Sequence, residues 1–108
     1  MAHYCFLDAN NIVTAIIPGQ NENTVVGGIS DWEAYYGEKW GAVCKRTSFN
    51  THGNQHTGPG EPFRYNYGEI GYTFDPTLGD DGGFIAPKPG PNFILNRDTG
   101  LWEPPFDE

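Results

Sequence analysis

Glycine and proline divide the segment 64–105 into short pieces, and this limits its fold more than any other feature of the sequence. The 108 residues include 15 glycines and 9 prolines. Both types interrupt regular structure, because glycine favours turns and proline lacks the backbone N–H that a central strand needs. The aromatic runs between these breaks predict two β-hairpins joined by an extended connection: strands in 65–74 and 84–86, the prolines of 87–91, then strands in 93–95 and 101–103.

The beginning of the chain predicts another hairpin. Apolar residues in 3–8 and β-branched residues in 12–17 flank an asparagine-containing turn at 9–11. Asparagine tolerates positive φ and can hydrogen bond to its own backbone, so this pattern favours two antiparallel strands. Pro18 and Gly19 are expected to end the second strand.

One short helix is expected. Ser30 or Asp31 can cap a helix that begins at Trp32, where aromatic residues recur at helical spacing. Gly37 interrupts the pattern and limits the helix to two or three turns. The alternating residues of 40–49 then predict a further strand.

These elements together predict a mainly β protein: a small single domain, residues 1–108, of antiparallel hairpins with one short helix and proline-rich extended segments. A chain of this length is too short to bury two independent cores. Around 50–63 the residues are rich in glycine and almost without apolar side chains, so we expect a long surface loop there. The segment 84–108 is expected to form an extended hairpin region.

The charge of the chain disfavours nucleic acid as a partner. Six Lys and Arg residues against 14 Asp and Glu residues give a net charge of -8 at pH 7. Binding to a phosphate backbone depends on cationic side chains that displace counterions. The sequence also has no run of about 20 apolar residues and no basic leader, so we expect no membrane association and synthesis in a cytosol.

Two cysteines, Cys5 and Cys44, are the only thiols of the sequence. In a chain expected to fold in a cytosol, we predict that both are reduced and buried as small apolar side chains. A disulfide between them is the less favoured alternative, and their spacing matches no metal or redox motif.

Two groups of residues could suggest a metal site, and neither pattern is specific. His52 and His56 are four residues apart, but on a glycine-rich loop this spacing does not fix their geometry. Asp75, Asp80 and Asp81 do not have the spacing of a calcium-binding EF-hand loop, and polar turns whose Asp side chains bond to backbone amides explain them better. We therefore predict no metal and no cofactor.

Paired carboxylates could serve as the acid and base of a glycosidase. The sequence pairs none of the candidates with another, and an acidic protein contains many carboxylates by chance. We therefore expect that the protein is not an enzyme. The carboxylates considered are Glu33, Glu38, Glu61, Glu69 and Asp75.

Aromatic residues are the main chemical resource of the C-terminal half. For any single ring, packing in the core is the simpler interpretation. As a group beside rigid prolines they favour a protein interface, because aromatic anchors dominate interface energetics. Sugar binding by stacking is a further alternative that needs two exposed rings beside polar side chains. The predicted interface residues are Tyr65, Tyr67, Tyr72, Phe84, Phe93, Trp102, Pro104 and Pro105.

Four stretches carry a resemblance to a known group of proteins: TSFN at 47–50, RYNYGEIGYTFD at 64–75, FIAPKP at 84–89 and NFILNRDTGLWEP at 92–104. In this order they resemble small proteins of marine tailed phages, including cyanophages. The N-terminal hairpin also matches the usual start of that group. The chain departs from the group's pattern at Glu69, where small residues are usual, and at Ala86, where proline is usual.

The resemblance implies a component of the virion, with no catalytic residue to carry over. The leading hypothesis is an accessory virion structural protein, a capsid decoration or cement protein that binds the outer shell. A tail, neck or fibre-associated virion protein and a glycan-binding module for host attachment are the alternatives. The expected partner is the major capsid protein or another virion protein, the expected location is the virion surface, and homo-oligomer formation is compatible with this interpretation.

Overall fold

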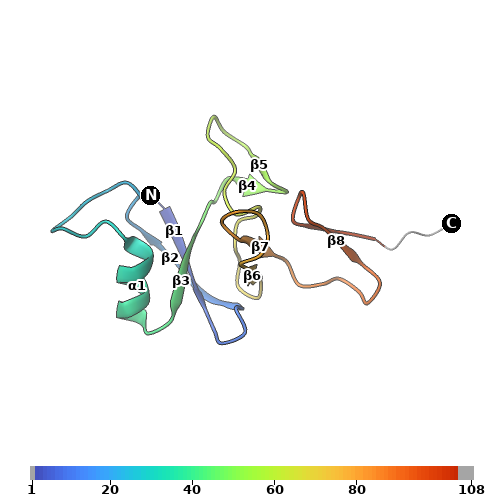
Figure 1. The fold of residues 1–108 in the computed structure, drawn as a ribbon, viewed down its shortest axis with the longest axis horizontal. Helices are drawn as coiled ribbons and strands as arrows, with labels where there is room; N and C mark the ends of the chain where they lie inside the picture. The colour runs from blue at the N-terminus through green and yellow to red at the C-terminus, as the bar shows by residue number, and fades with distance from the viewer. Residues whose placement is uncertain (1, 105–108) are drawn as a thin grey trace.

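A three-stranded antiparallel sheet in the order β2-β1-β3 forms the centre of the fold (Figure 1). The structure is a computed structural model that describes residues 2–104, and it confirms a small, mainly β fold with one short helix. The strands are β1 (Ala2–Leu7), β2 (Val13–Gly19) and β3 (Val43–Thr47). β1 is the central strand because it is apolar on both faces, and nearly all of its residues are buried.

The end of the second strand differs from the sequence prediction. β2 continues through Pro18 and Gly19, which pair with His3 and Ala2 of β1. The expectation that these residues end the strand was wrong, because β2 lies at the edge of its sheet. An edge strand tolerates proline, since one side of it has no ladder partner to lose.

The helix α1 (Trp32–Trp40) packs against one face of the sheet. The side chain of Asp31 caps it by accepting a hydrogen bond from the Ala34 amide at 3.1 Å, as one of the two cap predictions expected. Gly37 lies inside the helix, and a larger residue would not fit there. A Cβ atom at this position would stand 2.8 Å from the Ala42 carbonyl oxygen, where the chain returns to β3. No helix in the described residues is long and apolar enough to cross a bilayer.

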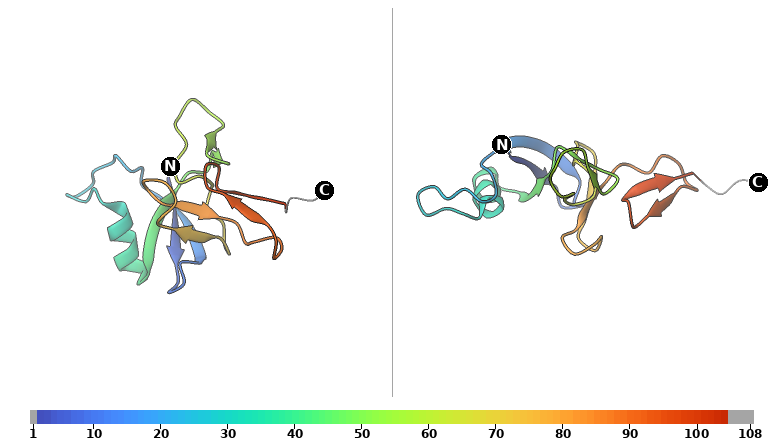
Figure 2. Two further views of the ribbon diagram at one scale, coloured as in Figure 1. Left: turned by 45° about the vertical axis from the view of Figure 1, so that its right-hand side comes forward. Right: turned by 90° about the horizontal axis from the view of Figure 1, so that it is seen from above.

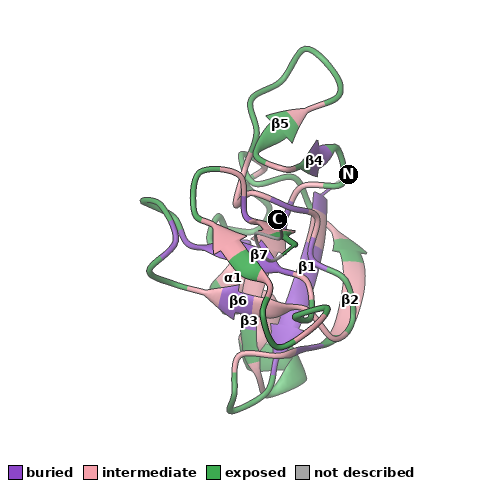
Figure 3. Ribbon diagram, turned by 90° about the vertical axis from the view of Figure 1, so that its right-hand side faces the viewer, coloured by how far each residue is buried: buried purple, intermediate pink, exposed green. Residues whose placement is uncertain are grey.

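Each face of the sheet has its own hydrophobic core. On the helix side, Tyr4 and Phe6 of β1 pack with Trp32 of α1. On the other side, the core includes Phe74 and Phe84 from a second hairpin, β6 (Thr73–Asp75) and β7 (Gly83–Ile85). Figure 3 shows buried residues along β1 and within β6 and β7, whereas β2 is largely intermediate or exposed. The sheet is thus enclosed between a helix and a hairpin.

Most of the strand predicted at 65–74 is not a strand. Only its end forms β6, because Arg64 and Tyr65 have φ values of 55° and 69°, which direct the chain into turns. The next backbone N–H groups make hydrogen bonds that do not belong to a β-sheet ladder. The Tyr67 amide donates to the Thr51 carbonyl at 2.9 Å, and the Gly68 amide donates to Thr47 Oγ1 at 2.7 Å. The hairpin closing at 84–86 was predicted correctly.

The segment 50–63 was expected to be a loop without structure of its own, and this is wrong for its first part. It contains a short hairpin, β4 (Thr51–His52) and β5 (Gln55–His56). Thr51 is buried and its hydroxyl oxygen accepts a hydrogen bond from the Phe63 amide at 3.1 Å. Thr51 thus helps to anchor a segment that has few apolar side chains to bury.

The last hairpin, β8 (Ile94–Asn96) and β9 (Leu101–Glu103), lies to one side of the rest of the fold (Figure 2). A lone two-stranded hairpin is only marginally stable in water, so it needs support from the body of the protein. Asn66 Nδ2 donates to the Gly100 carbonyl at 2.9 Å, and the Trp102 indole N–H donates to the Ala86 carbonyl at 2.7 Å. These bonds hold the hairpin at its turn and along β9.

Candidate interaction surface

A groove of about 510 Å³ lies between the β6-β7 hairpin and the β8-β9 hairpin. Phe74 and Ile85, which belong to the body of the protein, are buried beside it. Pro87, Leu95 and Trp102 line it with more exposed apolar surface. We call the surface that these five residues form the hairpin groove. Such a concave apolar surface with a few polar groups is typical of a binding site.

Trp102 is held in one orientation within the hairpin groove. Its indole N–H donates to the Ala86 carbonyl oxygen, and Lys88 Nζ lies 5.7 Å from the centre of its ring. Leu95 is its cross-strand partner in the β8-β9 ladder. A tryptophan that is already ordered loses little side-chain entropy when a partner covers it, which favours a role as an interface anchor.

A second set of contacts connects the two hairpins that form the groove. Arg97 donates through Nη2 to the carbonyl and hydroxyl oxygens of Thr77, both at 3.2 Å, and its Nη1 lies 3.8 Å from Asp75 Oδ2. The hydrogen bond from the Thr77 hydroxyl, helped by the Thr77 amide and by Arg97, lowers the pKa of Asp75. Asp75 therefore serves the turn and the junction between the hairpins.

The structure divides the predicted interface residues among different parts of the molecule. Trp102 lines the hairpin groove, but Phe84 is 0% exposed and cannot offer its ring to a partner. The assignment of Phe84 to an interface was wrong, because its ring fills the core beneath β1. Tyr72 packs against the same core, and its hydroxyl donates to Glu69 at 3.5 Å.

The remaining predicted residues also have distinct surroundings. Tyr65 lies against backbone, since Cβ atoms at Gly79, Gly83 and Gly100 would each come within 3 Å of it. Tyr67 packs edge-on against Phe49, at 5.2 Å between ring centres. The others belong to the C-terminal region: Phe93 is half-buried, Pro104 is exposed, and Pro105 lies outside the described residues.

Four residues of the hairpin groove were missed at the sequence level: Phe74, Ile85, Pro87 and Leu95. Leu95 could have been found from the hairpin register, which places it opposite Trp102. Ile85 and Pro87 could not be found in this way, because their part in the groove depends on how the β8-β9 hairpin packs beside the β6-β7 hairpin.

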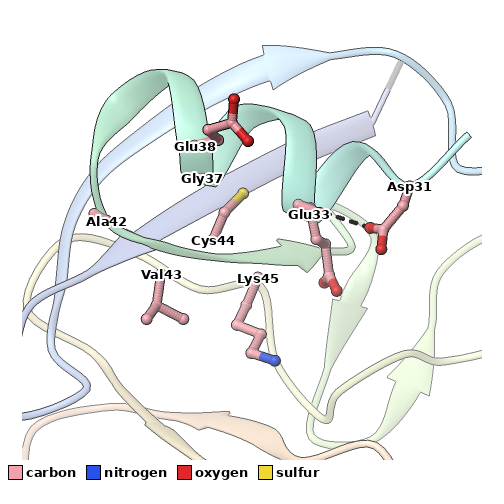
Figure 4. Close-up of a pocket in the computed structure, with 9 residues that line it drawn as sticks. Asp31, Glu33, Gly37, Glu38, Ala42, Val43, Cys44 and Lys45 are labelled. Carbon is pink, nitrogen blue, oxygen red and sulfur yellow. Dashed lines mark hydrogen bonds between the residues drawn. The ribbon is translucent and has the colours of Figure 1, made fainter. Parts of the chain in front are cut away.

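A separate hollow of about 400 Å³ lies beside α1 and β3 and contains Glu33 and Glu38, two of the carboxylates considered for catalysis (Figure 4). Glu33 Oε2 accepts hydrogen bonds from Arg64 Nη1 and the Arg46 amide, both at 2.6 Å. Figure 4 shows the Glu38 carboxylate directed away from that of Glu33. Glu33 thus joins the helix to the sheet and to the segment after β5, which is a structural role.

The two thiols lie on opposite faces of the sheet. Cys5 packs in the core beside Phe84 and Cys44 in the core beside Trp32, and both are free. They occupy neighbouring strands, but Cys44 pairs with Phe6, so the alternation of side chains separates them. The prediction of reduced, buried cysteines is confirmed.

We expect neither thiol to react in the folded protein. Burial raises the pKa of Cys5 and of Cys44 to about 12, and the nearby Glu33 carboxylate adds to this effect at Cys44. At pH 8 only about one such thiol in ten thousand is the nucleophilic thiolate. A thiol-reactive disulfide reagent should label both cysteines in guanidinium chloride and leave the native protein unlabelled over the same time. If the native protein is labelled as fast as a free, exposed thiol, this expectation is contradicted.

The two candidate metal-binding groups do not form a site. His52 and His56 lie on opposite strands of the β4-β5 hairpin, and the His56 ring accepts a hydrogen bond from the Gly58 amide at 3.0 Å. Within residues 2–104, no three side chains of His, Cys, Asp or Glu lie close enough together to hold a metal ion.

Comparisons with protein-family models, with curated proteins and with solved structures found no match for this chain.

Proposed function

We propose that the protein is an accessory virion structural protein, a capsid decoration protein that binds the outer shell through the hairpin groove. The observation that carries this proposal is the groove itself, where Trp102 is held ready beside Leu95 and Pro87. Tryptophan is one of the residue types enriched among interface hot spots, which lie in well-packed sites. The partner is a loop or strand edge of the major capsid protein.

The sequence supports the virion assignment independently of the groove. The resemblance to small proteins of marine tailed phages includes 84–89 and 92–104, and these two segments contribute much of the groove lining. The net charge of -8 keeps a surface-bound protein soluble and disfavours adhesion to packaged nucleic acid.

The proposed activity is stabilisation by binding. A protein that binds the assembled shell, and not the separated subunits, shifts the equilibrium toward assembly by mass action. No bond is made or broken in this mechanism. The groove supplies the anchor.

Particles that lack the protein should lose their nucleic acid at a lower temperature than complete particles. Release of nucleic acid on heating, followed with a fluorescent dye, measures this difference, and addition of the purified protein should restore the original profile. Quantitative mass spectrometry gives the copy number, which should reach hundreds per particle. Unchanged heat resistance, or a copy number near a small multiple of six, would reject decoration of the capsid.

The groove is tested by Trp102→Ala. Loss of a hot-spot tryptophan costs about 2 kcal/mol or more, so affinity for protein-free particles should fall at least about twentyfold. Trp102→Phe keeps an apolar ring and should recover part of the affinity. Ile70→Ala is the control, because Ile70 is 68% exposed and lies outside the groove. Equal binding by Trp102→Ala and the parent protein would exclude the groove as the attachment site.

A further inference from the structure

A second candidate binding site lies away from the hairpin groove, at the start of β1 and the end of β3. It is a hollow of about 150 Å³ whose lining includes His3, Asn21, Arg46, Phe49 and Asn50. These residues come from separate parts of the chain and meet because His3 of β1 pairs with Thr47 of β3. The proposed function makes no use of this hollow.

The apolar part of the hollow is an exposed but oriented aromatic ring. Phe49 is 67% exposed, although a phenylalanine normally seeks the core. His3 and Tyr67 pack against it at 5.8 and 5.2 Å between ring centres, with interplanar angles of 31° and 79°. Two flanking rings thus limit how Phe49 can turn while much of its surface stays in solvent.

The polar part of the hollow has free hydrogen-bonding capacity. Within residues 2–104, no hydrogen bond uses the side chain of His3, Asn21 or Asn50. An amide both donates and accepts, as does a neutral imidazole. Arg46 Nη1 lies 3.6 Å from Glu22 Oε1, so the charges at the rim largely compensate each other.

We propose that this hollow binds a neutral pyranose saccharide. One face of a pyranose ring consists of C–H groups, which pack on the negative face of an aromatic ring, and its hydroxyl groups require partners that both donate and accept. Phe49 and the partly exposed ring of His3 supply the two aromatic surfaces, and the amides of Asn21 and Asn50, with the His3 ring nitrogens, supply the polar partners. Neutral sugars are favoured over sulfated or sialylated ones because the protein carries a net charge of -8.

A glycan array that contains neutral, sialylated and sulfated glycans tests this inference on the full-length protein. We expect binding to neutral glycans and weaker or no binding to the anionic ones. Phe49→Ala should reduce the affinity for the strongest array ligand at least about tenfold, measured by calorimetric titration. Ile70→Ala is a matched control, since Ile70 is 68% exposed, and should bind like the parent protein.

A second variant distinguishes recognition of the sugar hydroxyl groups from non-specific binding to the exposed Phe49 ring. The double substitution Asn21→Ala and Asn50→Ala leaves the ring of Phe49 in place and removes the two amides. It should also weaken binding at least about tenfold if hydroxyl groups are recognised. Absence of any neutral ligand on the array, or full affinity in either variant, would overturn the inference. Shell attachment in both variants should be unchanged, because the hairpin groove is intact in them.

Discussion

Replacement of Asn66 by alanine is expected to lower the free energy of unfolding by about 3 kcal/mol or more, because it leaves several buried polar groups without partners. Asn66 is 3% exposed. Its Oδ1 accepts from the Gly53 amide at 2.8 Å, and its Nδ2 donates to the carbonyls of Phe84 and Gly100 at 2.8 and 2.9 Å. One side chain thus connects the β4-β5 hairpin, β7 and the β8-β9 hairpin.

Chemical denaturation followed by tryptophan fluorescence measures the effect. Asn92→Ala is the matched control, because Asn92 is exposed, and it should change the unfolding free energy by less than about 0.5 kcal/mol. Asn66→Asp keeps an acceptor for the Gly53 amide but places a carboxylate oxygen toward two carbonyl groups, so it should also be strongly destabilising at neutral pH. If Asn66→Ala and Asn92→Ala unfold alike, Asn66 does not hold these segments together.

Hydrogen exchange gives Asn66 a second readout. Side-chain contacts, among them the bond from Asn66, attach the β8-β9 hairpin to the body, whereas β1 is paired on both sides. The amides of the hairpin should therefore lose protection in Asn66→Ala earlier than those of β1. Equal loss of protection in both regions would show that the side chain acts on global stability alone.

Phe84→Ala is the other substitution for which we expect a large effect, about 3 to 5 kcal/mol of unfolding free energy. Phe84 is 0% exposed and lies 5.2 Å from Phe74 between ring centres. Gly68 passes so close to this ring that a Cβ atom there would stand 2.6 Å from Phe84 Cδ1, so the surroundings have little freedom to fill the cavity. The loss should therefore be near the upper part of the range.

Phe49→Ala is the control for Phe84→Ala, because it removes the same side chain from a site that is 67% exposed. It should cost less than about 1 kcal/mol, since little surface returns to water. Thermal and chemical denaturation of the two variants should separate them clearly. Similar losses would mean that the core on this face of the sheet contributes far less than its burial indicates.

Local sequence signals predicted much of the fold. The N-terminal hairpin, the capped helix from Trp32 and the hairpin at the C-terminus each depend on contacts between residues close in the chain. Turn residues, caps and alternation of apolar residues report such contacts directly. The extent of β2 was mispredicted because the behaviour of Pro18 depends on the strand being at an edge.

The candidate sites were less predictable. Among the aromatic residues expected at an interface, Phe84 lies in the core and Trp102 lines the hairpin groove, although both belong to short strands of similar composition. Phe49, the exposed ring in the hollow at the start of β1 and the end of β3, was not singled out by the sequence as a binding residue. Its exposure depends on the positions of His3 and Tyr67, which are distant along the chain.

The sequence alone determined which short segments could become strands, turns or a helix, because glycine, proline and capping residues act on their own backbone. Tertiary structure decided which rings are enclosed and which meet solvent, because enclosure depends on the layers on either side of β1. It also placed Asn66 where three segments need a polar partner. Such a position has no local signature, since its partners come from distant parts of the chain.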